Sequence, residues 1–146
     1  MKRNLSLTLA AMIIVAAIAT TARAQMFGAQ TVRARIPFAF NVGKTSLPAG
    51  EYIVTVLNPG SDRRVLQIRS ANGRSSAIVQ TIELTGHATT NAKLVFHRYG
   101  TRYFFAQAQM AGGSTTLAAV KSKAERVEEQ TTAKSGQEIV VEIVAD

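Results

Sequence analysis

Residues 93–106 constrain the fold of this chain most, because they predict a β-hairpin rich in aromatic side chains. Two mostly apolar runs flank Gly100-Thr101, and glycine in the first position of a two-residue loop is typical of a type II′ turn. Aromatic side chains bury the most area per residue, so we expect the core to gather here. Both faces of the hairpin are apolar near the turn, so the pattern does not decide which face is buried. The register predicts three cross-strand pairs: Phe96 with Phe105, His97 with Phe104 and Arg98 with Tyr103.

Residues 31–42 form the clearest single strand, because apolar and polar side chains alternate along them. Arg33 and Arg35 share the polar face of this strand. Pro37 cannot donate a ladder hydrogen bond, which indicates an edge position or a bulge. Residues 43–50 read as a loop. Residues 51–57 are apolar on both faces and predict an interior strand that is covered on both sides.

Two further strands, residues 64–70 and 75–84, are predicted to pair around Asn72-Gly73, the strongest short hairpin signal in the chain. One face of this hairpin is apolar and the other is mixed, as a half-buried hairpin requires. Its register predicts four pairs: Ile68 with Ala77, Leu66 with Val79, Gln67 with Ile78 and Arg69 with Ser76.

The C-terminal part adds a short extended piece at residues 115–120, a helix at about 122–133 and a last strand at about 138–145. Ser122 with Glu125 three residues later is a capping box that starts the helix. Ala124 and Val127 are expected on one helix face, with Glu128 and Glu129 toward solvent. Short strands joined by turns, with one late helix, predict an all-β fold. We expect an antiparallel β-sandwich or small barrel of about seven strands.

The N-terminal residues 1–24 predict a secretory signal peptide, because a basic start, a short apolar run and Ala22-Arg23-Ala24 follow one another. The alternative is a membrane anchor, which the short apolar run disfavours. Residues 25–30 would be a linker and residues 31–146 a single β-rich domain. We therefore expect a periplasmic or secreted protein without a transmembrane segment after cleavage.

Charge and cysteine content narrow the possible partners. Removing the three basic residues of the signal peptide leaves 14 of 17 basic residues against nine acidic ones, a net charge of +5. In an exported protein this charge favours an anionic envelope component, or another protein, over nucleic acid. Plain solubility is the simpler explanation of such a charge. The absence of cysteine excludes thiol catalysis, thiolate zinc sites and iron–sulfur clusters, and we expect no cofactor.

Several segments resemble an uncharacterised group of small exported β-rich proteins of acidobacteria. The segments that carry the resemblance follow one another over most of the mature chain: residues 36–40 (IPFAF), 42–43 (VG), 47–52 (LPAGEY), 94–100 (LVFHRYG), 102–104 (RYF) and 121–126 (KSKAER). The resemblance fades after residue 126. It implies an exported β-rich domain and no particular activity.

No catalytic unit is evident in the sequence. Residues 42–45 (VGKT) match the end of a phosphate-binding loop, but the earlier glycine and the following helix are missing. His87 and His97 have no evident carboxylate partner, so we expect neither a metal site nor a catalytic triad. His97 reads as a structural residue. The carboxylates of the β-rich part, Glu51, Asp62 and Glu83, fall at predicted strand ends or turns, so the expected protein is not an enzyme.

The remaining candidate site is a surface. Arginine beside tyrosine can grip an anionic or sugar ligand, or can pair within the chain, as Arg98 on Tyr103 would. The candidate residues are Arg98, Tyr99, Arg102 and Tyr103 at the hairpin tip, with Arg33 and Arg35 on the first strand. We expect a non-enzymatic domain that binds to, or supports, the cell envelope. The alternatives are a hydrolase or isomerase with a site in a barrel mouth and a subunit that docks by strand addition through residues 138–145. The oligomeric state stays open.

Overall fold

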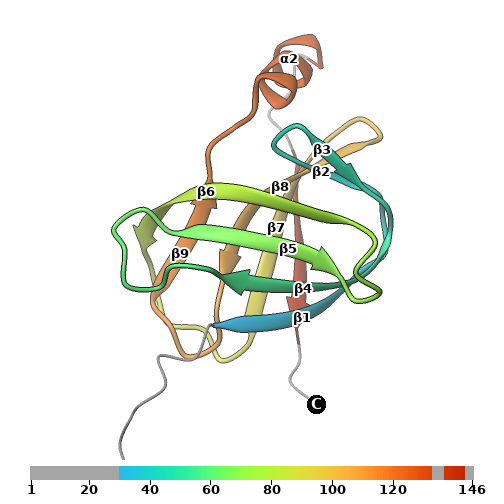
Figure 1. Cartoon of the computed structure of the whole chain (residues 1–146). Helices are drawn as coiled ribbons and strands as arrows, with labels where there is room; N and C mark the ends of the chain where they lie inside the picture. Colours follow the sequence, from blue (N-terminus) through green and yellow to red (C-terminus); the bar gives the residue numbers. More distant parts are fainter. Residues whose placement is uncertain (1–29, 133–136, 144–146) are drawn as a thin grey trace, which may run out of the picture.

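The protein is mostly β in a computed structural model, which describes residues 30–132 and 137–143 (Figure 1). The predicted signal peptide and most of the predicted linker lie outside these residues. In chain order the elements are β1 (Thr31–Ile36), β2 (Phe40–Val42), β3 (Thr45–Leu47), β4 (Gly50–Val56), β5 (Val65–Ser70), β6 (Ser76–Thr85), β7 (Ala92–Tyr99), β8 (Arg102–Gln109), β9 (Thr115–Ala119), α2 (Lys123–Thr131) and β10 (Gln137–Ile143).

The strands form one mixed sheet that does not close into a barrel. Its hydrogen-bonded order is β1-β4-β5-β6-β9-β8-β2-β3, and β7 pairs with both β8 and β10. The pairings are antiparallel except that between β2 and β8, which is parallel. The prediction of a mostly β fold with one short helix is confirmed. The fully antiparallel arrangement was wrong.

Strand β6 is the bend at which the sheet folds over on itself. Its N-terminal half pairs with β5, and its C-terminal half, from Thr81, pairs with β9. Figure 1 shows the strands β1, β4 and β5 in front, with the strands β7, β8 and β9 crossing behind them. The two halves therefore face each other across a common core, to which both contribute large, fully buried side chains: Tyr52, Phe40, Phe96, Ile36, Leu47, Leu66, Ile68, Leu94, Leu117, Val54 and Val56.

The described residues contain ten strands where about seven were expected. One predicted strand is divided in two, one predicted loop contains a strand, and the short extended piece at residues 115–120 pairs as the strand β9. Pro37 interrupts residues 31–42, so that β1 and β2 are separate strands. Residues 45–47, expected in a loop, form β3 and pair with β2 around Gly43, whose φ is +60°. A positive φ suits glycine at a tight turn. Among the described strands, β1 pairs with β4 alone, in line with the edge position that Pro37 indicated.

The predicted hairpin registers are confirmed. Strands β5 and β6 pair as expected, with Ile68 opposite Ala77. The hairpin of β7 and β8 turns at Gly100-Thr101, where Gly100 has a φ of +60°, as the first position of a primed turn requires. Its three expected pairs are present: Phe96 with Phe105, His97 with Phe104 and Arg98 with Tyr103.

A β-bulge decides which face of the hairpin is buried. The pairing moves from Phe96 opposite Phe105 to Val95 opposite Gln107, so Ala106 is an extra residue in β8. Phe105 and Ala108 consequently both face the common core, although they differ by three positions. The bulge therefore reverses the two faces of β8 once along the strand.

Strand β4 lies inside the sheet, but no described element covers its outer face. Tyr52, Val54 and Val56 are at most 1% exposed, while Leu57, just beyond the strand, is 48% exposed. The expectation that this strand is covered on both sides was wrong. The helix lies at the other half of the molecule, so the outer face of β1, β4 and β5 meets solvent (Figure 1).

Candidate functional site

Helix α2 begins where the sequence places it, but it turns a different face to the protein. Ser122 is the N-cap, and its Oγ accepts a hydrogen bond from the Glu125 backbone N–H at 3.1 Å. The Glu125 side chain is buried, whereas Val127 is 51% exposed. The prediction that Ala124 and Val127 form the inner face was wrong. The acidic residues face the hairpin because its outer face offers them polar partners.

Those partners are His97, Tyr99 and Arg102. The Oε1 atom of Glu125 lies 2.7 Å from His97 Nδ1 and accepts a hydrogen bond from the Tyr99 hydroxyl at 3.4 Å. Arg102 forms an ion pair with Glu128 and also lies over the Phe104 ring, 5.3 Å from its centroid. The helix is thus held to the hairpin tip by polar contacts on one face of the two strands.

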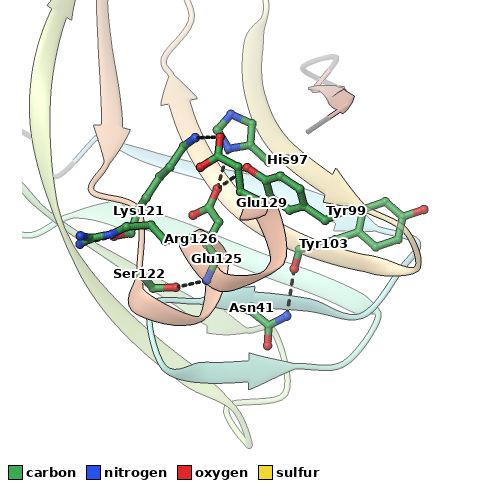
Figure 2. A network of polar contacts seen from close by, with 9 residues as sticks. All are labelled: Asn41, His97, Tyr99, Tyr103, Lys121, Ser122, Glu125, Arg126 and Glu129. Carbon is green, nitrogen blue, oxygen red and sulfur yellow. Dashed lines mark hydrogen bonds and ion pairs between the residues drawn. The ribbon is translucent and has the colours of Figure 1, made fainter. Parts of the chain in front are cut away.

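A second ion pair completes this network. Lys121 Nζ lies 2.6 Å from Glu129 Oε1, and the Arg126 guanidinium donates to the Lys121 carbonyl. Figure 2 shows Lys121, Glu125 and Glu129 converging on His97 and Tyr99 between the helix and the hairpin. We name the set His97, Tyr99, Lys121, Glu125 and Glu129 the helix clasp. The carboxylates of the helix clasp are paired with His97, Tyr99 and Lys121, as expected of groups that hold the helix in place.

Burial and neighbouring charges alter the acid–base behaviour of the clasp. Burial raises the pKa of Tyr99 above its ordinary value of 10.0, and the Glu125 carboxylate raises it further, while Lys121 acts in the opposite direction. The hydrogen bond to Glu129 raises the pKa of Lys121 above 10.5, against the effect of burial. Both groups hold their protons more tightly in the folded chain than in the unfolded chain.

The free energy of unfolding should therefore fall at alkaline pH. Tyr99 and Lys121 contribute fully below about pH 10, and the contribution is lost as the pH rises through their folded-state pKa values, because the unfolded chain releases these protons first. Urea denaturation at pH 9, 10 and 11 measures this decline. We expect Tyr99→Phe to make the decline shallower, since phenylalanine has no proton to lose. An equal slope in both proteins would contradict this assignment.

The residues predicted to form a hairpin surface do not form an open one. Tyr99 is only 3% exposed beneath the helix, so it is not available to a partner. Arg102 is engaged by Glu128. The guanidinium carbon of Arg98 lies 5.7 Å from the centroid of the Tyr103 ring, which is the intramolecular pair that the cross-strand spacing favoured. Tyr103 also stacks on Phe38, with centroids 4.0 Å apart.

Arg33 and Arg35 lie exposed on the outer face of β1, and the fold adds a third arginine. Arg33 is opposite Ile53 of β4, and Ile53 is opposite Arg69 of β5, so the three residues form one row on the same face. Arg35 lies two positions further along that face, opposite Glu51. Among the described residues, none of these arginines has an ion-pair partner. We name Arg33, Arg35 and Arg69 the arginine face.

Sequence reasoning missed Arg69 and the partner of His97. Arg69 was assigned to the mixed face of its hairpin, but nothing in the sequence placed that hairpin beside the first strand through β4. The prediction that His97 has no carboxylate partner was wrong, because Glu125 supplies one from 28 positions away. The sequence predicts that the Glu125 side chain caps the helix together with Ser122. In the structure, Ser122 caps the helix and the Glu125 side chain contacts His97 and Tyr99.

The other residues considered as catalytic or metal-binding candidates do not form a cluster in the described chain. His87 is exposed in the loop after β6. Glu83 forms an ion pair with Arg64. Within the described chain, no three His, Asp or Glu side chains are placed to share a metal ion. The barrel mouth that the hydrolase alternative needed is absent because the sheet is not closed.

One concave region lies where β4 begins beside the β5–β6 turn. It has a volume of about 300 Å³. Glu51 is the one carboxylate along its wall, and the Tyr52 hydroxyl donates to the Pro48 carbonyl at 2.6 Å. Its lining residues are Pro48, Ala49, Gly50, Glu51, Tyr52, Ser70, Ala71, Asn72 and Ser75. A single carboxylate does not make an acid–base pair, so this pocket adds no catalytic constellation.

The C-terminal strand β10 is already paired within the chain, to β7, with Ile139 opposite Phe96. Docking of a partner by strand addition would therefore have to use the opposite edge of β10. In the described ranges, no helix is both long enough and apolar enough to traverse a bilayer.

Comparison with known proteins gives no match: no family model matches the chain, and neither a curated protein nor a solved structure is significantly similar to it.

Proposed function

We propose that this chain is a non-enzymatic, exported β-rich domain that associates with an anionic surface of the cell envelope. The contact surface would be the outer face of β1, β4 and β5. The observation that carries the proposal is the arginine face, three exposed cations on one face of the sheet without an ion-pair partner among the described residues. The signal-peptide pattern of residues 1–24 supports export.

The electrostatics of the arginine face support binding of an anion rather than intramolecular stabilisation. Neighbouring strands are about 4.8 Å apart, so the backbones of Arg33 and Arg69 are about 10 Å apart across β4. Such a spacing presents several charges at once to an extended anionic surface. Each arginine near an anionic membrane surface contributes about 1 kcal/mol to binding. Guanidinium groups also bind phosphate and carboxylate in a bidentate manner.

The architecture that goes with this proposal is the sandwich rather than the barrel. Two halves of one folded sheet that share a core, with open edges, support that assignment. In a sandwich, each half has one outer face that can bind a partner. Helix α2 contacts the hairpin of one half, and the arginine face lies on the other half.

Replacing Arg33, Arg35 and Arg69 by glutamine should weaken binding to anionic material by about 100-fold, since about 3 kcal/mol of attraction is lost. Binding to vesicles that contain phosphatidylglycerol, and to dextran sulfate, measures this loss at fixed salt. The matched control is K44Q/R98Q/K123Q, which removes the same charge from exposed sites elsewhere. The proposal fails if the wild-type protein binds neither material, or if both triple variants lose affinity equally.

A further inference from the structure

The outer face that carries the arginines becomes apolar toward its other end. Along the sheet, the row of Arg33 and Arg69 is followed by a row in which Thr55 lies opposite Gln67 and Gln67 opposite Ile78. Ile78 is 61% exposed. Three further exposed apolar side chains continue this region: Leu57 at 48%, Ile82 at 55% and Leu84 at 43%.

These side chains point to the same side of the sheet. Ile78, Ile82 and Leu84 lie on the side of β6 opposite its buried residues Ala77, Val79 and Thr81. Ile78 is in the part of β6 that pairs with β5, and Ile82 and Leu84 are in the part beyond the bend that pairs with β9. Leu57 follows β4 on the face of Thr55, and its backbone N–H donates to the Val65 carbonyl at 2.9 Å. We name Leu57, Ile78, Ile82 and Leu84 the apolar end of the face.

The side chains between the arginine face and the apolar end carry no charge. Thr55, Gln67 and Gln80 occupy the intervening positions. Glu51 lies opposite Arg35 at one end of the arginine face, and Asp62 lies in the loop before β5. Glu83, next to Ile82, alternates to the other side of β6 and is paired with Arg64. The face therefore combines unpaired cations with exposed aliphatic groups and repels no anion at its centre.

A soluble polyanion could bind the arginines, but it has no apolar groups to contact the isoleucines. A bilayer offers both, because apolar side chains enter the boundary of head groups and acyl chains while arginines extend toward the phosphates. Exposed apolar clusters of this kind mark sites of protein or membrane interaction. The adjacent unpaired cations favour the membrane, since they complement an anionic lipid surface.

We propose that the partner of this face is an anionic lipid bilayer, entered by Ile78, Ile82, Leu57 and Leu84 while the arginine face contacts lipid phosphates. This inference rests on the proposed function and specifies its partner. It makes the protein a peripheral membrane protein that lies on the bilayer through the outer face of β1, β4 and β5 and the outer side of β6, where the sheet bends.

The test replaces Ile78 and Ile82 by serine and measures binding to phosphatidylglycerol-containing vesicles and to dextran sulfate. We expect I78S/I82S to lose vesicle affinity by about tenfold or more, because two exposed aliphatic groups no longer enter the lipid. Affinity for dextran sulfate should stay within about twofold, because the arginines remain. The matched control is V127S/V140S, which alters two valines that are 51% and 50% exposed elsewhere and should bind vesicles like the wild type.

The outcomes separate this inference from the function on which it rests. If I78S/I82S binds vesicles as the wild type does while the arginine variant does not, the partner is recognised by charge alone. The bilayer proposal is then overturned and the proposed function survives. If the wild type is a dimer that I78S/I82S converts to monomer, without vesicle binding, the face belongs to a second copy and the bilayer proposal is again overturned. Circular dichroism of each variant verifies that the fold is retained.

Discussion

Replacing Phe96 by alanine will lower the free energy of unfolding by about 3–5 kcal/mol. Phe96 is 0% exposed and lies where the two halves of the folded sheet meet. Its ring makes edge-on contacts with the rings of Phe38, Phe40 and Phe105, with centroids 5.2, 5.3 and 5.8 Å away. Alanine loses these contacts and leaves a cavity that neighbouring strands cannot fill. A domain of ordinary stability, about 5–15 kcal/mol, would lose a large share of it.

Urea denaturation followed by tyrosine fluorescence measures this effect. Ile78→Ala is the control, because Ile78 is 61% exposed and its truncation should change the free energy of unfolding by no more than about 0.5 kcal/mol. A loss below about 1 kcal/mol for Phe96→Ala would mean that the common core is not packed around this ring.

Replacing Glu125 by leucine will release helix α2 from the hairpin while the sheet stays folded. The change leaves His97 Nδ1 and the Tyr99 hydroxyl without their shared acceptor, and each buried polar group left unpaired costs about 1–3 kcal/mol. The backbone cap from Ser122 does not involve the Glu125 side chain. The loss should therefore appear as detachment of the helix rather than as global unfolding.

Hydrogen exchange of the amides in residues 123–131 measures the release. We expect faster exchange there in Glu125→Leu, with unchanged protection of β5. Glu125→Gln should lie between the two proteins, because its amide oxygen can still accept a hydrogen bond. Val127→Ala on the exposed helix face is the control and should leave protection unchanged. Wild-type protection of the helix in Glu125→Leu would show that the clasp does not hold it.

The parts of the fold that were predictable depend on local chemistry. Asn72-Gly73 and Gly100-Thr101 fix their turns, and the turns fix every pair of β5 with β6 and the pairs of β7 with β8 from Phe96 to the turn. Ser122 starts the helix where its hydroxyl can cap it. In each case a few neighbouring residues determine the local structure.

What the sequence did not reveal depends on contacts between distant segments. The bulge at Ala106 reverses the faces of β8. A linear pattern does not reveal the bulge, because both faces of this strand are apolar near the turn. The orientation of helix α2 follows from His97 and Tyr99, which lie more than 20 positions away. The arginine face can be predicted only if the strand order is known, because β4 lies between β1 and β5 and so brings Arg33 and Arg69 into one row.

The two halves of the folded sheet differ in what lies on their outer faces. Tyr99 and Phe104 on the hairpin are buried, at 3% and 1% exposed, and helix α2 contacts this side through Glu125 and Glu128. The outer face of β1, β4 and β5 is exposed and cationic. This difference is why the proposed contact surface lies on the arginine face and not at the hairpin tip.

Arginine-selective labelling with phenylglyoxal, read by mass spectrometry with and without phosphatidylglycerol-containing vesicles, tests the contact surface most directly. We expect vesicles to protect Arg33, Arg35 and Arg69, while the exposed Arg98 and Arg126 react at the same rate in both samples. Protection of Arg98 with continued labelling of Arg33 and Arg69 would contradict it and return the binding surface to the hairpin.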